Sequence, residues 1–198
     1  MLEYSETVML EQGLEAIIRS TSDRDLQASV DFFRAFPDDE KQYFAVDLCC
    51  PGQVEKRYEQ VKAGKAVRLV ATCEGRIVGE AGLDSMRYGW LSRSGDVTLI
   101  ALPQYRGKKL REALAREIFL LAARLGMHVL LARVLDSQSR TRQIFKSLGF
   151  RHEATQKGHA VDAGGREHDV HLMTFSLKKM WSQMEEAIEE TSSSPREW

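Results

Sequence analysis

The feature that most constrains the fold is a long amphipathic helix that directly follows an apolar strand. Residues 95–102 (GDVTLIAL) are typical of a buried strand, and residues 107–125 carry apolar side chains at helical spacing. These side chains fall on a single stripe of the helix: Leu110, Leu114, Ile118, Leu121 and Leu125. Gly126 follows where a C-terminal cap belongs. A helix with one apolar stripe has to bury it, so we expect the stripe to pack against a sheet.

The remaining elements indicate a mixed α/β (α+β) protein. The predicted strands are residues 14–18, 66–73, 76–81, 95–102, 129–134, 151–160 and 166–176, and further helices begin near Ser22, Asp38, Val54 and Ser139. Helices come first, followed by strands that two helices interrupt. We therefore expect a central twisted mixed sheet, splayed near its middle and flanked by helices on both faces. Residues 96–102 should form its central strand.

The C-terminal part of the chain has a different composition. Met180, Trp181, Met184 and Ile188 have the spacing of an amphipathic helix, and residues 191–195 (TSSSP) are typical of a disordered tail. We therefore divide the chain into one domain at residues 1–180 and a C-terminal helix with a disordered tail at 181–198. The helix would dock on the sheet or on a second subunit, which leaves a homodimer open.

Charge and cysteine content exclude several classes of protein. The chain has 28 Lys and Arg against 29 Asp and Glu, a formal net charge of −1, which disfavours a nucleic-acid partner. No apolar run reaches the roughly 18 residues of a membrane span. Cys49, Cys50 and Cys73 include no CxxC pair, so neither a disulfide framework nor a zinc framework is expected. We expect a cytoplasmic protein without a metal and without a membrane partner.

The turn between the predicted strand and the long helix is unusually basic. It carries four cations: Arg106, Lys108, Lys109 and Arg111. A helix N-terminus presents unpaired backbone N–H groups and the positive end of the helix dipole, so cations there are unfavourably placed. A bound anion would resolve this conflict. The alternative is that the four side chains extend into solvent.

At this turn the sequence resembles motif A of the GNAT N-acetyltransferase superfamily. The residues Pro-x-Tyr-Arg-Gly-x-x-Leu at 103–110 are similar to that motif, whose core pattern is (Gln/Arg)-x-x-Gly-x-(Gly/Ala). The segments Asp136-Ser137-Gln138 and Ile144-Phe145-Lys146-Ser147-Leu148-Gly149-Phe150 resemble the second signature of the family. The two signatures occur in the expected order, and the resemblance covers about residues 14–178. It implies the acyl-CoA N-acyltransferase fold.

The resemblance also implies an acyltransferase that uses acetyl-CoA as donor and an amine, on a small molecule or a protein, as acceptor. The donor pyrophosphate would lie on the backbone of Arg106, Gly107, Lys108, Lys109, Leu110 and Arg111. The pantetheine arm would run beside Leu99, Ile100 and Ala101, and Gln138 and Phe145 would face the thiol end. A base must remove the amine proton, and a donor can help the leaving thiolate.

The chain departs from the family pattern at four of these positions. Lys109 and Arg111 stand where the motif has small residues, which let the backbone approach a pyrophosphate. Each long cation could swing outward and neutralise phosphate, or fill the site. Phe145 replaces the tyrosine that often serves the leaving group, and Gln138 replaces an asparagine. The alternative function is therefore a catalytically degenerate GNAT-fold protein that regulates or binds a ligand.

Asp96 is the candidate base. Strand alternation places Asp96, Thr98 and Ile100 on one face, and a carboxylate near the start of this strand is a common base position in the family. A surface aspartate at a strand end is the alternative. Glu80 and Asp84 on the preceding strand are weaker candidates.

Three other features suggest weaker hypotheses. His168 and His171 lie three residues apart on a strand and so point to opposite faces, which argues against shared metal coordination. Residues 88–90 (Tyr-Gly-Trp) would either line an acceptor pocket or form a plain surface hairpin. The basic turn could also bind an anion other than a CoA, although the balanced charge weighs against nucleic acid. The acceptor itself cannot be inferred, because loops shape such pockets.

Overall fold

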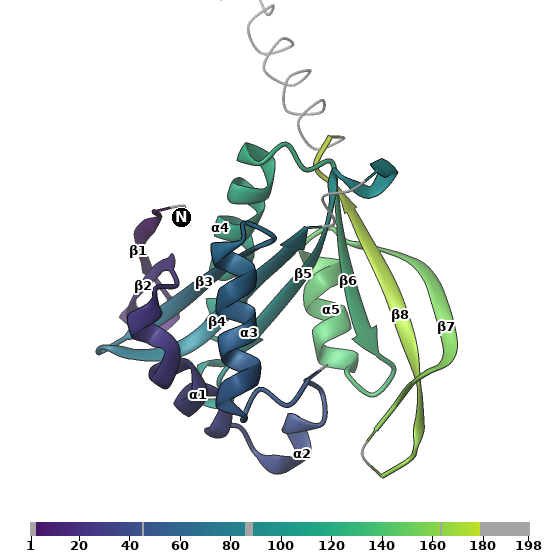
Figure 1. Cartoon of the computed structure of the whole chain (residues 1–198), viewed down its shortest axis with the longest axis horizontal. Coiled ribbons are helices and arrows are strands. Elements are labelled where there is room, and N and C mark those ends of the chain that lie inside the picture. Colours follow the sequence, from purple (N-terminus) through teal and green to yellow (C-terminus); the bar gives the residue numbers. More distant parts are fainter. Residues whose placement is uncertain (1–2, 45, 86–88, 163, 179–198) are drawn as a thin grey trace, which may run out of the picture.

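An eight-stranded mixed sheet runs through the molecule (Figure 1). The computed structural model describes residues 3–44, 46–85, 89–162 and 164–178. The strands are β1 (Ser5–Met9), β2 (Glu15–Ser20), β3 (Ala66–Cys73), β4 (Arg76–Ser85), β5 (Ser94–Ala101), β6 (Val129–Leu135), β7 (Arg151–Val161) and β8 (Glu167–Ser176). Their order is β1-β2-β3-β4-β5-β6-β8-β7. All neighbouring pairs are antiparallel except β5 and β6, which are parallel.

The sheet splays between β5 and β6. Ser94, Gly95 and Asp96 pair with Val129, Leu130 and Leu131, and no further register pair joins the two strands within the described ranges. Beyond these pairs β5 continues to Ala101 and β6 to Leu135, and the two strands diverge (Figure 1). The predicted splay and the central place of β5 are both confirmed.

Helices cover both faces of the sheet (Figure 1). The helices are α1 (Leu26–Arg34), α2 (Asp38–Lys41), α3 (Pro51–Lys62), α4 (Leu110–Arg124) and α5 (Ser139–Ser147), with 3₁₀ turns at Glu11–Gly13, Asp23–Asp25, Gly89–Leu91 and Pro103–Tyr105. Successive residues of β3 point to opposite faces. Leu69 and Ala71 therefore join the core beneath α4 and α5, and Val70 joins the core beneath α1 and α3.

The apolar stripe of α4 faces the sheet as predicted. Leu114, Ile118 and Leu121 are at most 1% exposed. Leu125 differs, because it is the C-terminal cap of the helix and lies 42% exposed. The predicted start at residue 107 was three residues too early. Gly107 and Lys109 have positive φ angles, which are incompatible with a right-handed helix, so α4 begins at Leu110.

Most of the other predicted elements are confirmed, within a few residues at their ends. Two strands differ from the prediction. The edge strand β1, which is short and has few apolar residues, was not predicted, and β4 continues four residues beyond its predicted end, to Ser85. The predicted C-terminal helix and tail, the boundary at residue 180 and Tyr88 lie outside the described residues. In the described part of the chain, no helix is long and apolar enough to cross a membrane.

Candidate active site

The turn between β5 and α4 has the backbone of an anion cradle. Gly107 has φ = 75°, and Lys109 caps the helix with φ = 59°, in the left-handed region. The N–H of Ala113 donates to the Lys109 carbonyl at 3.0 Å and makes the first bond of the helix. The N–H groups of Leu110 and Arg111 therefore precede the first intrahelical bond and are available to a ligand.

Lys109 adopts a left-handed backbone conformation, which glycine adopts without strain. A left-handed conformation costs a residue other than glycine about 1–2 kcal/mol. The side chain points outward: it is 67% exposed, and its Nζ pairs with Glu11 Oε1 at 2.7 Å. The hydrogen bond to Glu11 also raises the pKa of Lys109. The long side chain therefore does not fill the turn.

The neighbouring cations also have partners in the protein. Arg106 forms an ion pair with Glu40 of α2, and the Lys108 ammonium lies 5.2 Å from the centre of the Tyr105 ring. With Lys109 on Glu11, three of the four cations make a contact that offsets their position at the helix start. The two alternatives drawn from the sequence, a bound anion and extension into solvent, did not include these contacts within the protein.

Arg111, the fourth cation of the turn, differs from the other three in its burial and its hydrogen bonding. Its side chain is half-buried, and its Nε has no hydrogen-bond partner among the described residues. Burial lowers the pKa of Arg111, and the neighbouring Arg106 lowers it further. A buried guanidinium without a full set of acceptors is costly, and a phosphate oxygen would supply one. The residues present therefore fit a phosphate-bearing ligand at this turn.

The strand β5 offers an open backbone edge on the side of the splay. Past Asp96 it has no register partner on β6 in the described ranges. Leu99 and Ala101 point into the α4 core, and half-buried Ile100 packs toward α1 and α3. The edge facing β6 thus retains polar backbone groups that an extended ligand arm can pair with.

Asp96 lies where the pairing between β5 and β6 ends. Its carboxylate forms an ion pair with Arg133 of β6, while Oδ1 is buried and has no hydrogen-bond partner within the described ranges. The side chain is 26% exposed, and Asp84 lies directly opposite it on β4. Asp96 and Thr98 share a face, as predicted, and Thr98 is exposed there. The carboxylate therefore lies at the splay, next to solvent.

The two weaker base candidates are engaged elsewhere. Glu80 is 3% exposed and pairs with Arg57 of α3. Asp84 pairs with Arg68, itself 3% exposed on β3. Between these acids, a Cβ placed on Gly82 would lie 3.1 Å from Arg68 Nη1, so the glycine leaves room for the guanidinium. Both acids are thus engaged by arginines. Of the three acids, only Asp96 has a buried oxygen without a hydrogen-bond partner in the described part of the chain.

The two candidate residues of the second signature lie at and within α5. The Oε1 of Gln138 accepts a hydrogen bond of 3.0 Å from the Leu135 N–H, which closes the turn from β6 into α5. Phe145 is 3% exposed, and its ring lies 4.9 Å from the ring of Phe150. The Phe145 ring is part of the hydrophobic core and has no proton to donate.

Several site residues were not identified from the sequence. Glu11, Glu40 and Arg133 come from segments distant in sequence: Glu40 lies 66 residues from Arg106, and Arg133 lies 37 residues from Asp96. Arg133 had one usable signal, because a cation inside an apolar strand usually has a specific partner. Nothing in the local pattern marked Glu11 or Glu40.

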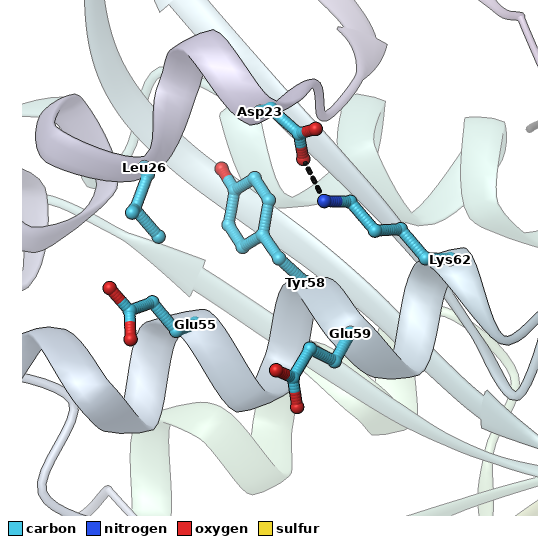
Figure 2. Close-up of a pocket in the computed structure, with 6 residues that line it drawn as sticks. All are labelled: Asp23, Leu26, Glu55, Tyr58, Glu59 and Lys62. Atoms are coloured by element: carbon cyan, nitrogen blue, oxygen red, sulfur yellow. Dashed lines mark ion pairs between the residues drawn. The ribbon is translucent and has the colours of Figure 1, made fainter.

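A separate pocket of about 220 Å³ lies between the start of α1 and α3. Figure 2 shows its lining, which contains none of the candidate residues: Asp23, Leu26, Glu55, Tyr58, Glu59 and Lys62. Asp23 and Lys62 form an ion pair of 2.8 Å across it. The Tyr58 hydroxyl bonds to Ser29 at 2.9 Å, and burial raises its pKa to about 12. Tyr58 therefore stays neutral and joins the two helices.

His168 and His171 do not share a partner, as their spacing predicted. His168 contacts Asp162 at 3.0 Å and Asp136 at 3.3 Å. His171 instead contacts Arg142 of α5 and Thr155 of β7. Each histidine thus belongs to its own hydrogen-bond network.

Comparison with known proteins relates the fold to solved structures. No family model and no curated protein matches the sequence. The GNAT domain of PAT from S. lividans is 20% identical, with a TM-score of 0.72, and the match covers 87% of this chain and 97% of that one. A ribosomal-protein-S5-alanine acetyltransferase from Vibrio fischeri is 15% identical, with a TM-score of 0.74, and the match covers 90% of this chain and 98% of that one. A putative acetyltransferase from Salmonella typhimurium, solved with its cofactor acetyl-CoA, is 21% identical, with a TM-score of 0.70 over 81% and 93%. At such identities the likeness establishes the fold, and the activity has to be argued from the residues.

Proposed function

We propose that this chain, which has the fold of the GNAT acetyltransferases, transfers an acetyl group from acetyl-CoA to an amine acceptor. The observation that carries the proposal is Arg111 in the first turn of α4, a half-buried guanidinium whose Nε has no hydrogen-bond partner among the described residues. A phosphate-bearing donor would meet this need. The neighbour solved with acetyl-CoA supports the same choice of donor.

The proposed donor site follows β5 into α4. The backbone from Arg106 to Arg111, including Gly107, Lys108, Lys109 and Leu110, would hold the pyrophosphate, with Arg106 and Arg111 balancing its charge. The open edge of β5 at residues 99–101 would pair with the pantetheine arm. Gln138 and Phe145 would lie at the thiol end. Acetyl-CoA supplies the acetyl group as a thioester.

Asp96 is the proposed base. An amine has to lose a proton as it becomes an amide, and a positioned carboxylate can accept it. Arg133 holds the Asp96 carboxylate in place through their ion pair. Phe145 carries no ionisable group, so it cannot donate a proton to the departing thiolate. A CoA thiolate can leave without an acid.

A second candidate function is a GNAT-fold protein that binds a CoA ligand without catalysis. The observation that favours it is the pairing of Arg106 with Glu40 and of Lys109 with Glu11. These ion pairs already balance the charge of two cations of the turn. The substitutions at Lys109, Arg111 and Phe145 point the same way. The two candidates share a ligand and differ in whether an acetyl group is transferred.

Ligand binding is tested by thermal melts with acetyl-CoA, CoA and ATP in parallel. A ligand at about 100 times its Kd stabilises the native state by about 2.7 kcal/mol. For a chain of this size we expect acetyl-CoA to raise the Tm by about 5–10 °C. If acetyl-CoA and CoA leave the Tm unchanged, the donor assignment fails and only the fold remains.

Catalysis is tested with Asp96→Asn against a panel of polyamines, amino acids and peptides with free N-termini. We expect kcat to fall about 100-fold while acetyl-CoA affinity stays within about twofold of the parent. Asp169→Asn is the matched control, because Asp169 is also a strand aspartate in an ion pair, here with Lys157 at 2.6 Å. Acetyl-CoA binding without transfer to any amine would favour the second candidate function.

A further inference from the structure

The ion pair between Arg106 and Glu40 joins the basic turn to α2. We propose that Glu40 competes internally with the donor phosphates: its carboxylate holds Arg106 in the ligand-free protein, and donor binding releases Glu40 together with α2. The inference rests on the proposed function, since the competing anion is the pyrophosphate of acetyl-CoA. Glu40 then lowers the affinity for the donor and links donor binding to the position of α2.

The position of the pair suits such a competitor. Arg106 and Glu40 are 66 residues apart, so only the tertiary fold brings them together. Their side chains are 33% and 21% exposed, which gives the contact more weight than a fully solvated pair. Arg106 stands at the Gln/Arg position of the motif, next to the cradle made by Gly107 and Lys109. A carboxylate on Arg106 therefore stands beside the proposed pyrophosphate site.

Glu40 also acts on Arg111. Burial and the like charge of Arg106 both lower the pKa of Arg111, while the charge of Glu40 opposes that shift. The single negative charge of Glu40 thus acts on two guanidinium groups, and its carboxylate pairs with Arg106. Among the described residues the Arg111 Nε has no acceptor. A pyrophosphate brings more charge and more oxygens, so the exchange is favourable for both arginines.

The segment that Glu40 belongs to is weakly anchored. The helix α2 has only four residues, none of them buried, and its other ion pair, Lys41 with Asp38, lies within the helix. After α2 the chain is held by Phe44, whose ring lies 5.5 Å from Phe33 and 5.3 Å from Phe36. Loss of the Arg106 contact would therefore free α2 while the aromatic cluster keeps the chain in place. We expect donor binding to precede any change in α2.

The first test is Glu40→Gln, which removes the competing charge and keeps the side-chain shape. Isothermal titration with acetyl-CoA, and separately with inorganic pyrophosphate, should give about fivefold tighter binding of both than the parent. Asp39→Asn is the matched control: it removes the same charge from the adjacent exposed position of α2. Its affinities should stay within about twofold of the parent. Circular dichroism of each variant verifies the fold.

The outcomes of this titration separate the inference from the proposed function. Equal or weaker binding of both ligands by Glu40→Gln, or equal tightening by Asp39→Asn, overturns the inference even if acetyl-CoA binds well. Tighter pyrophosphate binding by Glu40→Gln without any acetyl-CoA binding supports the competitor role and rejects acetyl-CoA as donor. If no protein binds either ligand, both proposals are rejected.

The second test is hydrogen exchange of the amides of residues 38–44, with and without acetyl-CoA. Ligands usually slow exchange near their site, whereas release of Glu40 should speed exchange in α2 of the parent. In Glu40→Gln the same amides should exchange fast before the donor is added. Slower exchange in the parent on donor binding would overturn the release of α2.

Discussion

At the scale of single residues, the site depends on a lysine that adopts a glycine-like backbone. Lys109 sits at φ = 59° and caps α4 without a side-chain hydrogen bond to the helix. Its ion pair with Glu11, on the turn from β1 to β2, draws the side chain away from the cradle. The turn therefore has a left-handed backbone at a residue other than glycine, and the conformational cost can be measured as a change in the free energy of unfolding.

We predict that the protein is more stable with glycine than with alanine at residue 109. Both Lys109→Gly and Lys109→Ala remove the ion pair with Glu11. The difference between their free energies of unfolding therefore reports the cost of the left-handed backbone conformation. Glycine avoids the left-handed penalty, and we expect Lys109→Gly to be about 1 kcal/mol more stable in urea unfolding. At Arg116, inside α4 and exposed, the same comparison should reverse, with glycine about 1 kcal/mol less stable. An alanine variant as stable as glycine at 109 would contradict the assigned conformation.

The basic turn shows what residue patterns can and cannot reveal. From the sequence, four cations at a helix start suggest either a bound anion or side chains that extend into solvent. The structure instead places Glu11 and Glu40 on two of them and the Tyr105 ring against a third. These partners lie far along the chain, so no local window could include them. Of the four cations, Arg111 has a buried Nε without a hydrogen-bond partner among the described residues, and this is the remaining indication of a ligand.

At the scale of elements, α4 joins the turn to the core. Ile118 is fully buried between the helix and the sheet. We expect Ile118→Asp to destabilise the protein by at least about 3 kcal/mol, because it buries a charge without a partner. Leu120→Asp, on the 40% exposed side of the same helix, should change stability by no more than about 0.5 kcal/mol. Urea unfolding of the two variants checks the orientation of α4, and equal stabilities would contradict it.

The hairpin of β7 and β8 contains a histidine whose protonation should stabilise it. The hydrogen bond to Asp162 raises the pKa of His168, and the bond to Asp136 adds to this effect. A raised pKa in the folded state favours the protonated form. Its stabilisation is therefore complete below the ordinary histidine pKa of about 6.5 and is lost as the pH rises through the raised value.

We predict that the stability difference between the parent and His168→Gln is larger at about pH 5.5 than at about pH 8.5. Urea unfolding at both pH values measures it, and subtracting the variant removes contributions common to both proteins. His171 is one such contribution and has the opposite sign, because burial and Arg142 lower its pKa. A difference that does not depend on pH would show that His168 is neutral in the folded protein.

At the scale of the whole molecule, the sequence predicted the elements better than their contacts. Local periodicity was enough for the stripe of α4 and for the hairpins, because these depend on neighbouring residues. The edge strand β1 was missed, since its sequence SETVM has few apolar residues. The ion pair of Asp96 with Arg133 joins β5 to β6 and depends on the sheet topology. The candidate residues were identifiable by resemblance, and their partners were not.

The brief pairing of β5 with β6 also bears on the order in which the chain acquires its structure. The pairs β1–β2, β3–β4, β4–β5 and β7–β8 join strands adjacent in sequence, whereas β5 and β6 are separated by the whole of α4 and share three register pairs. Closing a long loop costs chain entropy before its contacts compensate. We expect the hairpins to assemble first and this junction to close after them. The turn from β5 into α4 then takes its final form in the same later step, after the hairpins have formed.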